Sequence, residues 1–251
     1  MKHRPMLRPY LLAAAIALAA RTSAQSTETP NEVGAGLGAM IYQGDLTPSP
    51  AGSYRTARPA VALWAARQLT SRLALRATLQ HGSVYGDDAR YTVPAWRSER
   101  ALRFSTSVSE ISLQAVYRPD NRWLLQPYLF AGVGYAFVKV NRDASAFNTA
   151  FFNGDKRVMD GLATDLATAP PRAVPVVPLG AGLRYNLTEA LSLHLETSYR
   201  LARTDYLDGF SAVGNPKRLD HYQSYILGAS WRFGSPGGGR GKSKGIGCPR
   251  W

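Results

Sequence analysis

The sequence predicts an all-β protein, an eight-stranded antiparallel up-and-down transmembrane β-barrel. Three observations predict it: long segments in which apolar and polar residues alternate, connections that alternate between short and long, and an export signal. The alternation is clearest in residues 190–202, where Leu191, Leu193 and Leu195 alternate with His194 and Glu196. A period of two with one apolar and one charged face indicates a strand between two environments. The segment exceeds the roughly 5–6 residues of a typical soluble strand and satisfies the about 9–11 of a tilted membrane-spanning strand.

Residues 1–24 are predicted to be a secretory signal peptide. Lys2, Arg4 and Arg8 precede an apolar run from Tyr10 to Ala20, and small residues lead to a cleavage site at Ala24. This run is too short to span a bilayer as a helix, and no other run reaches the roughly 18 residues that indicate one. An exported chain with apolar strand faces can then remain in a membrane only as a closed barrel. We therefore expect three regions: the signal peptide, a barrel over 25–233 and a basic, Gly-rich disordered tail over 234–251.

The net charge of +13 does not predict a nucleic-acid partner. Four of these charges belong to the signal peptide and four to the tail, which leaves +5 on the barrel domain. A modest surplus of this kind suits anionic lipid or glycan, so outer-membrane lipid is the expected partner. Cys248 is the only cysteine, which excludes an intramolecular disulfide and argues against a Cys-ligated zinc site. No phosphate-binding loop or metal-ligand spacing occurs, so no cofactor and no metal are expected.

The strand segments follow one another along the whole domain. They are 32–42, 58–69, 72–85, 102–118, 126–140, 174–187, 190–202 and 221–233. Three connections are short: Thr70-Ser71, 119–125 and Thr188-Glu189. Four are long: 43–57, 86–101, 141–173 and 203–220. Bacterial outer-membrane barrels keep their short turns in the periplasm. We therefore expect an integral outer-membrane protein with both termini periplasmic.

Each strand is predicted from its own set of alternate apolar residues. In chain order, the first four sets are Val33 to Ile41, then Val61 and Leu63, then Leu73 to Leu79, and then Ile111 to Tyr117. The last four are Leu129 to Phe137, Val177 to Tyr185, Leu191 to Leu201, and Tyr225 to Phe233. The second strand is the weakest, because Trp64 lies on the face opposite Val61 and Leu63.

A soluble lipocalin-like barrel would show the same period with its apolar face inward. Aromatic residues near the strand ends, such as Tyr117, Trp231 and Tyr135, favour the membrane, because they form the girdles expected at two lipid interfaces. Glycines fall on the polar face, where a narrow barrel must fit its contents. The last strand ends on an aromatic residue, Phe233.

The polar face carries charged residues that are expected to fill the interior. They are Arg76, Glu110, Arg184, His194, Glu196, Arg200 and Arg232. An eight-stranded barrel has room only for side chains, so we expect a packed polar core without an open pore. Buried charges are tolerated there when paired, so a structural role is expected. A proton path or a small-ligand site is the alternative.

A lipid-modifying enzyme is a competing class of function. It would require a nucleophile, a base and an orienting acid in contact. His81 and His221 are expected near the outer rim, with Ser83 and Ser224 close to them. Such pairs are common by chance, so no catalytic residues are predicted and no enzymatic activity is expected.

Four short segments carry a family resemblance. They are Tyr42-Gln43-Gly44-Asp45-Leu46, Arg100 to Ser105, Gln126 to Gly134 and Thr204-Asp205-Tyr206-Leu207-Asp208. In this order and spacing they resemble the PorG-like family of outer-membrane barrels from Bacteroidota, over roughly residues 31–233. The resemblance implies a structural or type IX secretion-associated component that contacts periplasmic secretion-ring proteins. That family defines no catalytic residues, and its members lack the basic tail seen here.

The loop residues of these segments have two interpretations. Asp45, Asp205, Tyr206 and Asp208 form the loop motif, whose carboxylates are expected to cap turns rather than bind a ligand or metal. A surface binding or adhesion barrel is a further alternative, and its specificity would then lie in loop 141–173.

Overall fold

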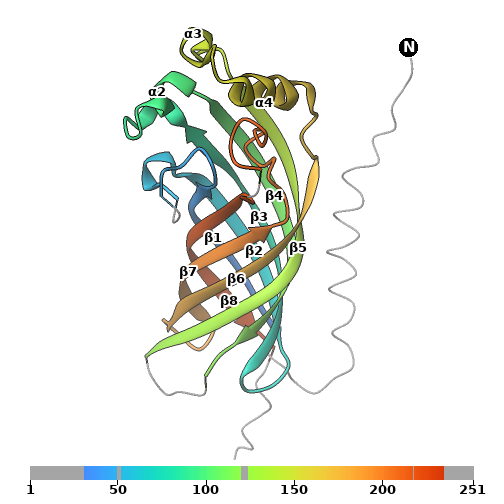
Figure 1. Ribbon diagram of the computed structural model, residues 1–251. Helices are drawn as coiled ribbons and strands as arrows, with labels where there is room; N and C mark the ends of the chain where they lie inside the picture. The colour runs from blue at the N-terminus through green and yellow to red at the C-terminus, as the bar shows by residue number, and fades with distance from the viewer. Residues whose placement is uncertain (1–30, 50–51, 120–123, 217, 235–251) are drawn as a thin grey trace, which may run out of the picture. The chain divides into compact units, whose positions relative to one another are not determined.

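Eight antiparallel strands close into a barrel in chain order, β1 to β8, in the computed structural model (Figure 1). The structure describes residues 31–49, 52–119, 124–216 and 218–234. The strands are β1 (Asn31–Gln43), β2 (Arg58–Gln68), β3 (Leu73–Asp87), β4 (Arg103–Tyr117), β5 (Leu125–Asp143), β6 (Ala173–Asn186), β7 (Leu191–Ala202) and β8 (His221–Phe233). The predicted all-β, eight-stranded barrel is confirmed. The predicted signal peptide, and the predicted tail beyond Gly234, lie outside the described residues.

The first and last strands close the barrel. β1 pairs with β8 in an antiparallel register that runs from Asn31 opposite Phe233 to Gln43 opposite His221. Neighbouring strands are paired all the way around, so the sheet has no free edge. A spanning structure in lipid requires this, because no water is present there to satisfy unpaired backbone groups.

The two faces of the wall match the predicted alternation. Exposed and buried positions alternate along β2 and β4, and the exposed residues in the middle of each strand are apolar: Leu63 on β2 is 55% exposed and Ile111 on β4 is 53% exposed. Along β2, Val61 and Leu63 point outward and Trp64 points inward, where it is 6% exposed. The apolar face therefore faces outward, as in a membrane barrel.

Trp64 fits in the interior because small residues face it. A Cβ atom added to Gly34 on β1 would overlap the Trp64 indole ring, and one added to Gly228 on β8 would lie 2.6 Å from it. The glycines on the polar face thus make room for the largest side chain in the lumen.

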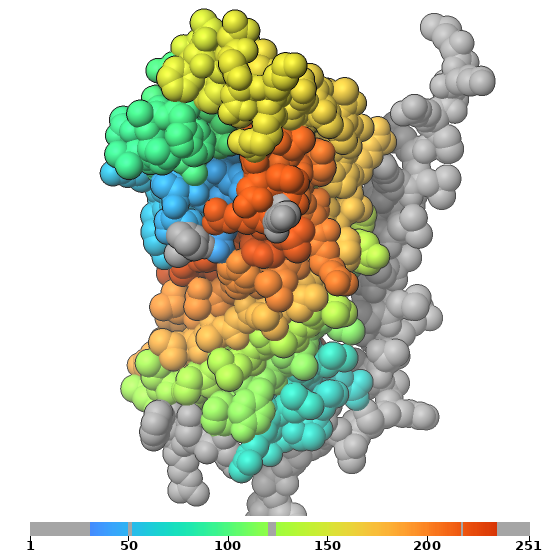
Figure 2. All heavy atoms as spheres, in the orientation of Figure 1, coloured from blue at the N-terminus to red at the C-terminus, as the bar shows by residue number. Residues whose placement is uncertain are grey.

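The long connections gather at one end of the barrel, which we call the loop end; the opposite end is the turn end. They contain η2 (Tyr54–Thr56), η3 (Asp88–Arg90), α2 (Trp96–Arg100), α3 (Thr149–Phe152) and α4 (Lys156–Ala167). The described residues of segments 44–57, 88–102, 144–172 and 203–220 pack together there, and we call them the loop head (Figure 2). The sequence predicted these segments as long loops, and the structure adds the helical turns and helices named above; β5 also extends three residues beyond its predicted end at 140. No helix among the described residues is long and apolar enough to cross a membrane.

Local sequence explains the two helices of the third long connection. Asn148 precedes α3 and accepts a hydrogen bond from the backbone N–H of Phe151, at 3.1 Å. Asp155 precedes α4 and accepts from the N–H of Val158, at 3.2 Å. Short polar side chains at this position satisfy the free N–H groups of a helix start.

Candidate functional site

The barrel interior is crossed by ion pairs, and the first group surrounds Glu32. Its carboxylate lies 3.0 Å from the guanidinium of Arg184, 3.5 Å from that of Arg118 and 3.5 Å from Nε2 of His194. Glu32 is only 5% exposed. A carboxylate buried to this extent is stable as an anion only because cations surround it.

A second group lies around Glu196. Arg76 donates to its carboxylate at 2.5 Å, and the Tyr128 hydroxyl donates to the same oxygen at 2.6 Å. Arg76 also donates to the side-chain oxygen of Gln114 through two nitrogens, at 2.9 and 2.7 Å. The guanidinium is therefore fixed by two strands other than its own.

A third group lies around Glu110. Arg200 reaches its carboxylate at 3.0 Å and Tyr222 donates to it at 2.8 Å. Arg200 also donates to Gln80 and Ser198. With these three groups, the interior contains paired side chains at successive levels, an arrangement suited to a structural plug.

The predicted lumen residues are brought together with one exception. Arg76, Glu110, Arg184, His194, Glu196 and Arg200 all contact partners across the lumen. Arg232 is half-buried and forms no ion pair with any of the described residues. The predicted set omitted Glu32, Arg118 and Tyr128. Glu32 and Tyr128 take polar-face positions of their strands, so the alternation itself could have identified both.

The loop head is held by a tyrosine between two carboxyl groups. The hydroxyl oxygen of Tyr42 lies 2.6 Å from Oδ2 of Asp208 and 2.5 Å from Oδ1 of Asp220. The other oxygen of Asp220 accepts from the backbone N–H groups of Leu207 and Asp208. All three side chains are essentially inaccessible to solvent.

This arrangement needs an additional proton. The Tyr42 hydroxyl has one hydrogen and can donate to only one of its two neighbours. The second short contact therefore requires a protonated carboxyl that donates to the hydroxyl oxygen. Burial, which disfavours the charged form, raises the pKa of Asp220 to about 8 and also raises that of Asp208, where the neighbouring Asp220 charge adds to the effect.

Of the other residues of the loop motif, Asp45 joins two connections, whereas Asp205 and Tyr206 make contacts within the last one. Asp45 accepts from the backbone N–H of Asn215 at 2.5 Å, and Asp205 accepts from the Ser211 hydroxyl. Burial raises the pKa of Asp205 to about 6. Tyr206 is half-buried, and its backbone N–H donates to the side chain of Thr204 at 3.1 Å.

Helix α4 is tied to the last loop by a buried carboxylate. Asp165 accepts from the backbone N–H groups of Ala212 and Val213, at 3.0 and 2.9 Å. Arg142 donates to the carbonyls of Asp165, Leu166 and Thr168 at the C-terminal end of α4. These contacts satisfy carbonyls that a helix end leaves free, so α4 is a fixed part of the loop head.

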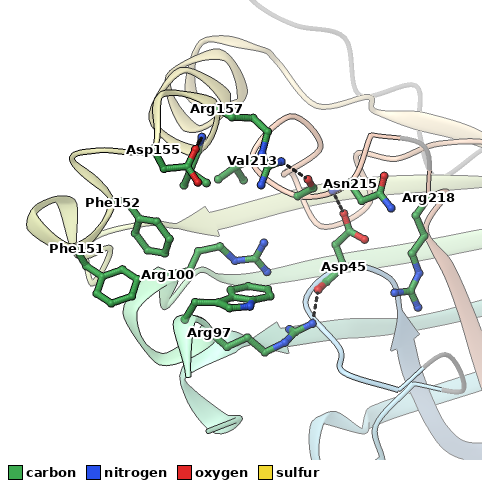
Figure 3. Close-up of a pocket in the computed structure, with 13 residues that line it drawn as sticks. Asp45, Arg97, Arg100, Phe151, Phe152, Asp155, Arg157, Val213, Asn215 and Arg218 are labelled. Carbon is green, nitrogen blue, oxygen red and sulfur yellow. Dashed lines mark hydrogen bonds between the residues drawn. The ribbon is translucent and has the colours of Figure 1, made fainter. Parts of the chain in front are cut away.

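A cavity of about 560 Å³ lies between the four connections of the loop head (Figure 3). Its lining residues are Asp45, Trp96, Arg97, Arg100, Phe151, Phe152, Asp155, Arg157, Val158, Val213, Gly214, Asn215 and Arg218. We call it the head cavity. Of its lining, the predicted set contained only Asp45. Arg97 and the other arginines were not predicted as site residues, because they lie in connections without any periodic pattern.

Two arginines of the cavity wall share one buried carboxylate. Arg97 contacts Oδ1 of Asp88 at 2.8 Å, and Arg100 contacts Oδ2 at 2.5 Å. Asp88 is fully buried, and Arg97 and Arg100 are 7% and 4% exposed. The guanidinium carbons lie 5.1 and 4.9 Å from the centre of the Trp96 ring. These distances permit cation–π attraction to the indole.

The enzyme hypothesis concerns His81 and His221, with Ser83 and Ser224 expected close to them. Nδ1 of His81 lies 2.9 Å from the Ser109 hydroxyl on β4, not from Ser83. Ser224 faces the lumen, where its hydroxyl lies 2.9 Å from that of Ser198. The register of β3 and β4 places Ser109 opposite His81, so the serine of the neighbouring strand is its hydrogen-bond partner. No carboxylate among the described residues contacts His81.

Within the described ranges, no group of three His, Cys, Asp or Glu side chains is arranged to hold a metal ion. The carboxylates of the loop head instead accept hydrogen bonds from backbone and hydroxyl groups.

A family model described as an outer membrane protein β-barrel domain matches residues 10–233. The chain is similar to several solved structures, which include Ail of Yersinia pestis in complex with the heparin analogue sucrose octasulfate, at 12% identity and a TM-score of 0.45, covering 82% of this chain and 100% of that one. Neisserial surface protein A matches at 13% identity and a TM-score of 0.47, covering 81% of this chain and 97% of that one. OprG from Pseudomonas aeruginosa matches at 10% identity and a TM-score of 0.45, covering 82% of this chain and 97% of that one. No curated protein matches the chain.

Proposed function

Because the chain belongs to the outer membrane protein β-barrel domain family, we propose that this integral outer-membrane barrel is a non-enzymatic binding protein that acts through its loop head. The observation that carries the proposal is the contrast between the two parts of the barrel. Ion pairs occupy the lumen, whereas the loop head contains a cavity of about 560 Å³. Loops that only connected strands would not need buried contacts such as those of Asp165 and Arg142.

The proposal places the loop head outside the cell. Bacterial outer-membrane barrels keep their short turns in the periplasm and extend their long loops outward. The turn end, with both ends of the barrel domain, would then face the periplasm.

Transport and catalysis have less support. Glu32, Glu110 and Glu196 each hold guanidinium groups in the lumen of a barrel that is too narrow for an aqueous channel. His81 and Ser109 form a pair on the exposed face without an orienting acid among the described residues. A hydrolytic site of the usual kind requires that third group.

A shortened loop head tests the proposal. Residues 145–171 would be replaced by a brief Gly-Ser link, which removes α3 and α4 and leaves every strand in place. Material cross-linked to intact cells would be compared between this variant and the full chain. The proposal expects the full chain to retain partners that the variant loses, while both assemble in the outer membrane. Identical bound material with both chains would contradict a binding role for the loop head.

The secretion-associated role implied by the PorG-like resemblance is the second candidate. It would use the turn end, where β2 and β3, and β6 and β7, are joined by short turns, and the basic tail. The tail carries Arg240, Lys242, Lys244 and Arg250 without any acid, so an acidic periplasmic ring protein would suit it. Removal of residues 236–251 and raised salt should then each weaken such a complex. Co-purification that is unaffected by both changes would contradict contact through the tail.

A further inference from the structure

We propose that the head cavity binds a small organic acid, a carboxylate carried on a six-membered ring. This inference rests on the proposed binding function of the loop head and names the ligand class. A volume of about 560 Å³ falls within the roughly 300–1,000 Å³ typical of small-molecule sites. The walls come from four connections far apart in the chain, so the site exists only when the loop head is folded.

The charge of the cavity favours a monovalent anion. Arg97, Arg100, Arg157 and Arg218 line it together with Asp45 and Asp155, and Asp88 lies behind the wall. Four guanidinium groups thus face three carboxylates, which leaves one positive charge in excess. A ligand with a single carboxylate balances this excess, whereas a divalent phosphate would exceed it.

The carboxylates already present are engaged with the protein itself. Asp155 accepts the N–H of Val158 at the start of α4, and Asp45 accepts that of Asn215. Asp88 is divided between two arginines. None of these three carboxylates therefore forms an exclusive ion pair with one arginine of the cavity.

Unmatched donors are the second, independent observation. Nε of Arg97 and one terminal nitrogen of Arg100 are buried and have no hydrogen-bond partner. Buried donors are nearly always paired, and exceptions call for an explanation. Arg218 is half-buried, and its guanidinium makes no ion pair or hydrogen bond to the described residues. Figure 3 shows Arg100 and Arg218 on either side of Asp45. Guanidinium groups bind carboxylates with two parallel hydrogen bonds, so a ligand carboxylate in the cavity would supply the acceptors that Arg218 lacks.

The aromatic residues define the rest of the ligand. Trp96 is 39% exposed and Phe151 is 56% exposed, although both line the cavity. Phe152 is buried beside them, with its ring 4.9 Å from that of Phe151. An aromatic acid would stack on these rings, and a sugar acid would place the C–H face of its ring against the indole. Both sources share a carboxylate on a flat, ring-sized body.

Ligand-observed NMR with the full-length protein in lipid nanodiscs tests the inference. The probes are 4-fluorobenzoate and glucuronate, each with its neutral counterpart, 4-fluorobenzamide and glucose. The inference expects at least one acid to bind and its neutral counterpart to bind at least about tenfold more weakly, the factor that corresponds to about 1.4 kcal/mol. The acid that binds identifies the source. An acid and its amide or sugar that bind equally, or no binding of either acid, would overturn it.

Matched arginine variants keep the test specific. Arg218→Gln removes a cavity charge that has no structural partner among the described residues, so the fold should be retained. Arg172→Gln removes the same charge at an exposed loop-end position outside the cavity. We expect Arg218→Gln to weaken acid binding by about tenfold or more and Arg172→Gln to leave it unchanged. An equal loss of acid binding in the two variants would overturn the inference and indicate nonspecific electrostatic attraction. Should neither acid bind while the shortened loop head still loses partners on cells, this inference fails and the proposed function stands.

Discussion

Tyr42 and Asp220 connect the first strand to the last long loop. The Tyr42 hydroxyl oxygen lies 2.5 Å from Oδ1 of Asp220, and 178 residues separate the two positions in the chain. Asp208 completes the contact from within the loop at 2.6 Å. One phenolic oxygen thus fixes the segment 203–220 against the barrel wall, and the packing of the loop head depends on it.

Removing this hydroxyl should loosen the loop head without unfolding the barrel. Tyr42→Phe leaves two buried carboxyl groups without their shared partner, and the loss of such a bond costs about 1–3 kcal/mol. Hydrogen exchange at the amides of Leu207 and Asp208 should accelerate. Tyr135→Phe on the exposed face is the matched control and should change neither amide. Unchanged exchange in Tyr42→Phe would show that the hydroxyl does not hold the loop.

Stability of the loop head should fall as the pH rises. The pKa of Asp220 is raised from 3.8 to about 8 in the folded protein, so the folded state binds a proton that the unfolded loop releases. The stabilisation is complete below about pH 4 and is lost as the pH rises through about 8. Exchange at Leu207, corrected for its intrinsic pH dependence, should increase over this window. Asp220→Asn should reduce the slope, with Asp208, whose pKa is also raised by burial, supplying the remainder, and persistence of the same slope would exclude Asp220 as a source.

The lumen ion pairs should contribute far more to the stability of the barrel than the adjacent outward-facing residue does. Glu196→Ala leaves Arg76 and Tyr128 without their shared acceptor, and removing one partner of a buried pair typically costs about 3–5 kcal/mol. Thr197→Ala changes the exposed neighbour and should cost far less. Denaturant unfolding from lipid vesicles measures both. Similar losses for the two variants would mean that water screens the lumen charges.

Packing around Trp64 should restrict β1 to glycine at position 34. Gly34→Ala places a methyl group against the indole ring, which must shift, so barrel assembly should slow and stability should fall by about 1–3 kcal/mol. Ala35→Val, one residue along on the outward face, should be tolerated. The rate at which the heat-modifiable band appears on gels reports assembly. Equal rates for both variants would show that the indole can move freely.

The sequence predicted the wall of this barrel because period-two alternation is a local signal. It assigned Leu37 and Leu129 outward and Glu196 inward correctly. It could not predict which side chains meet across the lumen, because the contact of Arg76 with Glu196 spans 120 positions.

The loop head was the larger omission. Helix α2 has five residues, too few to show a periodic pattern, and its arginines acquire their role only from the distant segments around them. The start of α4 did have a local signal, since Asp155 precedes a helix-forming run, but this helix was not predicted. Asp45, Asp205 and Asp208 were identified as loop residues, but the two partners that hold the last of them, Tyr42 and Asp220, were not.

The central claim, that the loop head is the outward-facing functional part, is tested most directly by labelling intact cells. In a Cys248→Ser background, single cysteines would replace Phe151 in the loop head and Thr70 at the turn end, both exposed. A membrane-impermeant maleimide should label position 151 on intact cells and position 70 only after permeabilisation. Labelling of position 70 on intact cells, with position 151 protected, would contradict the account.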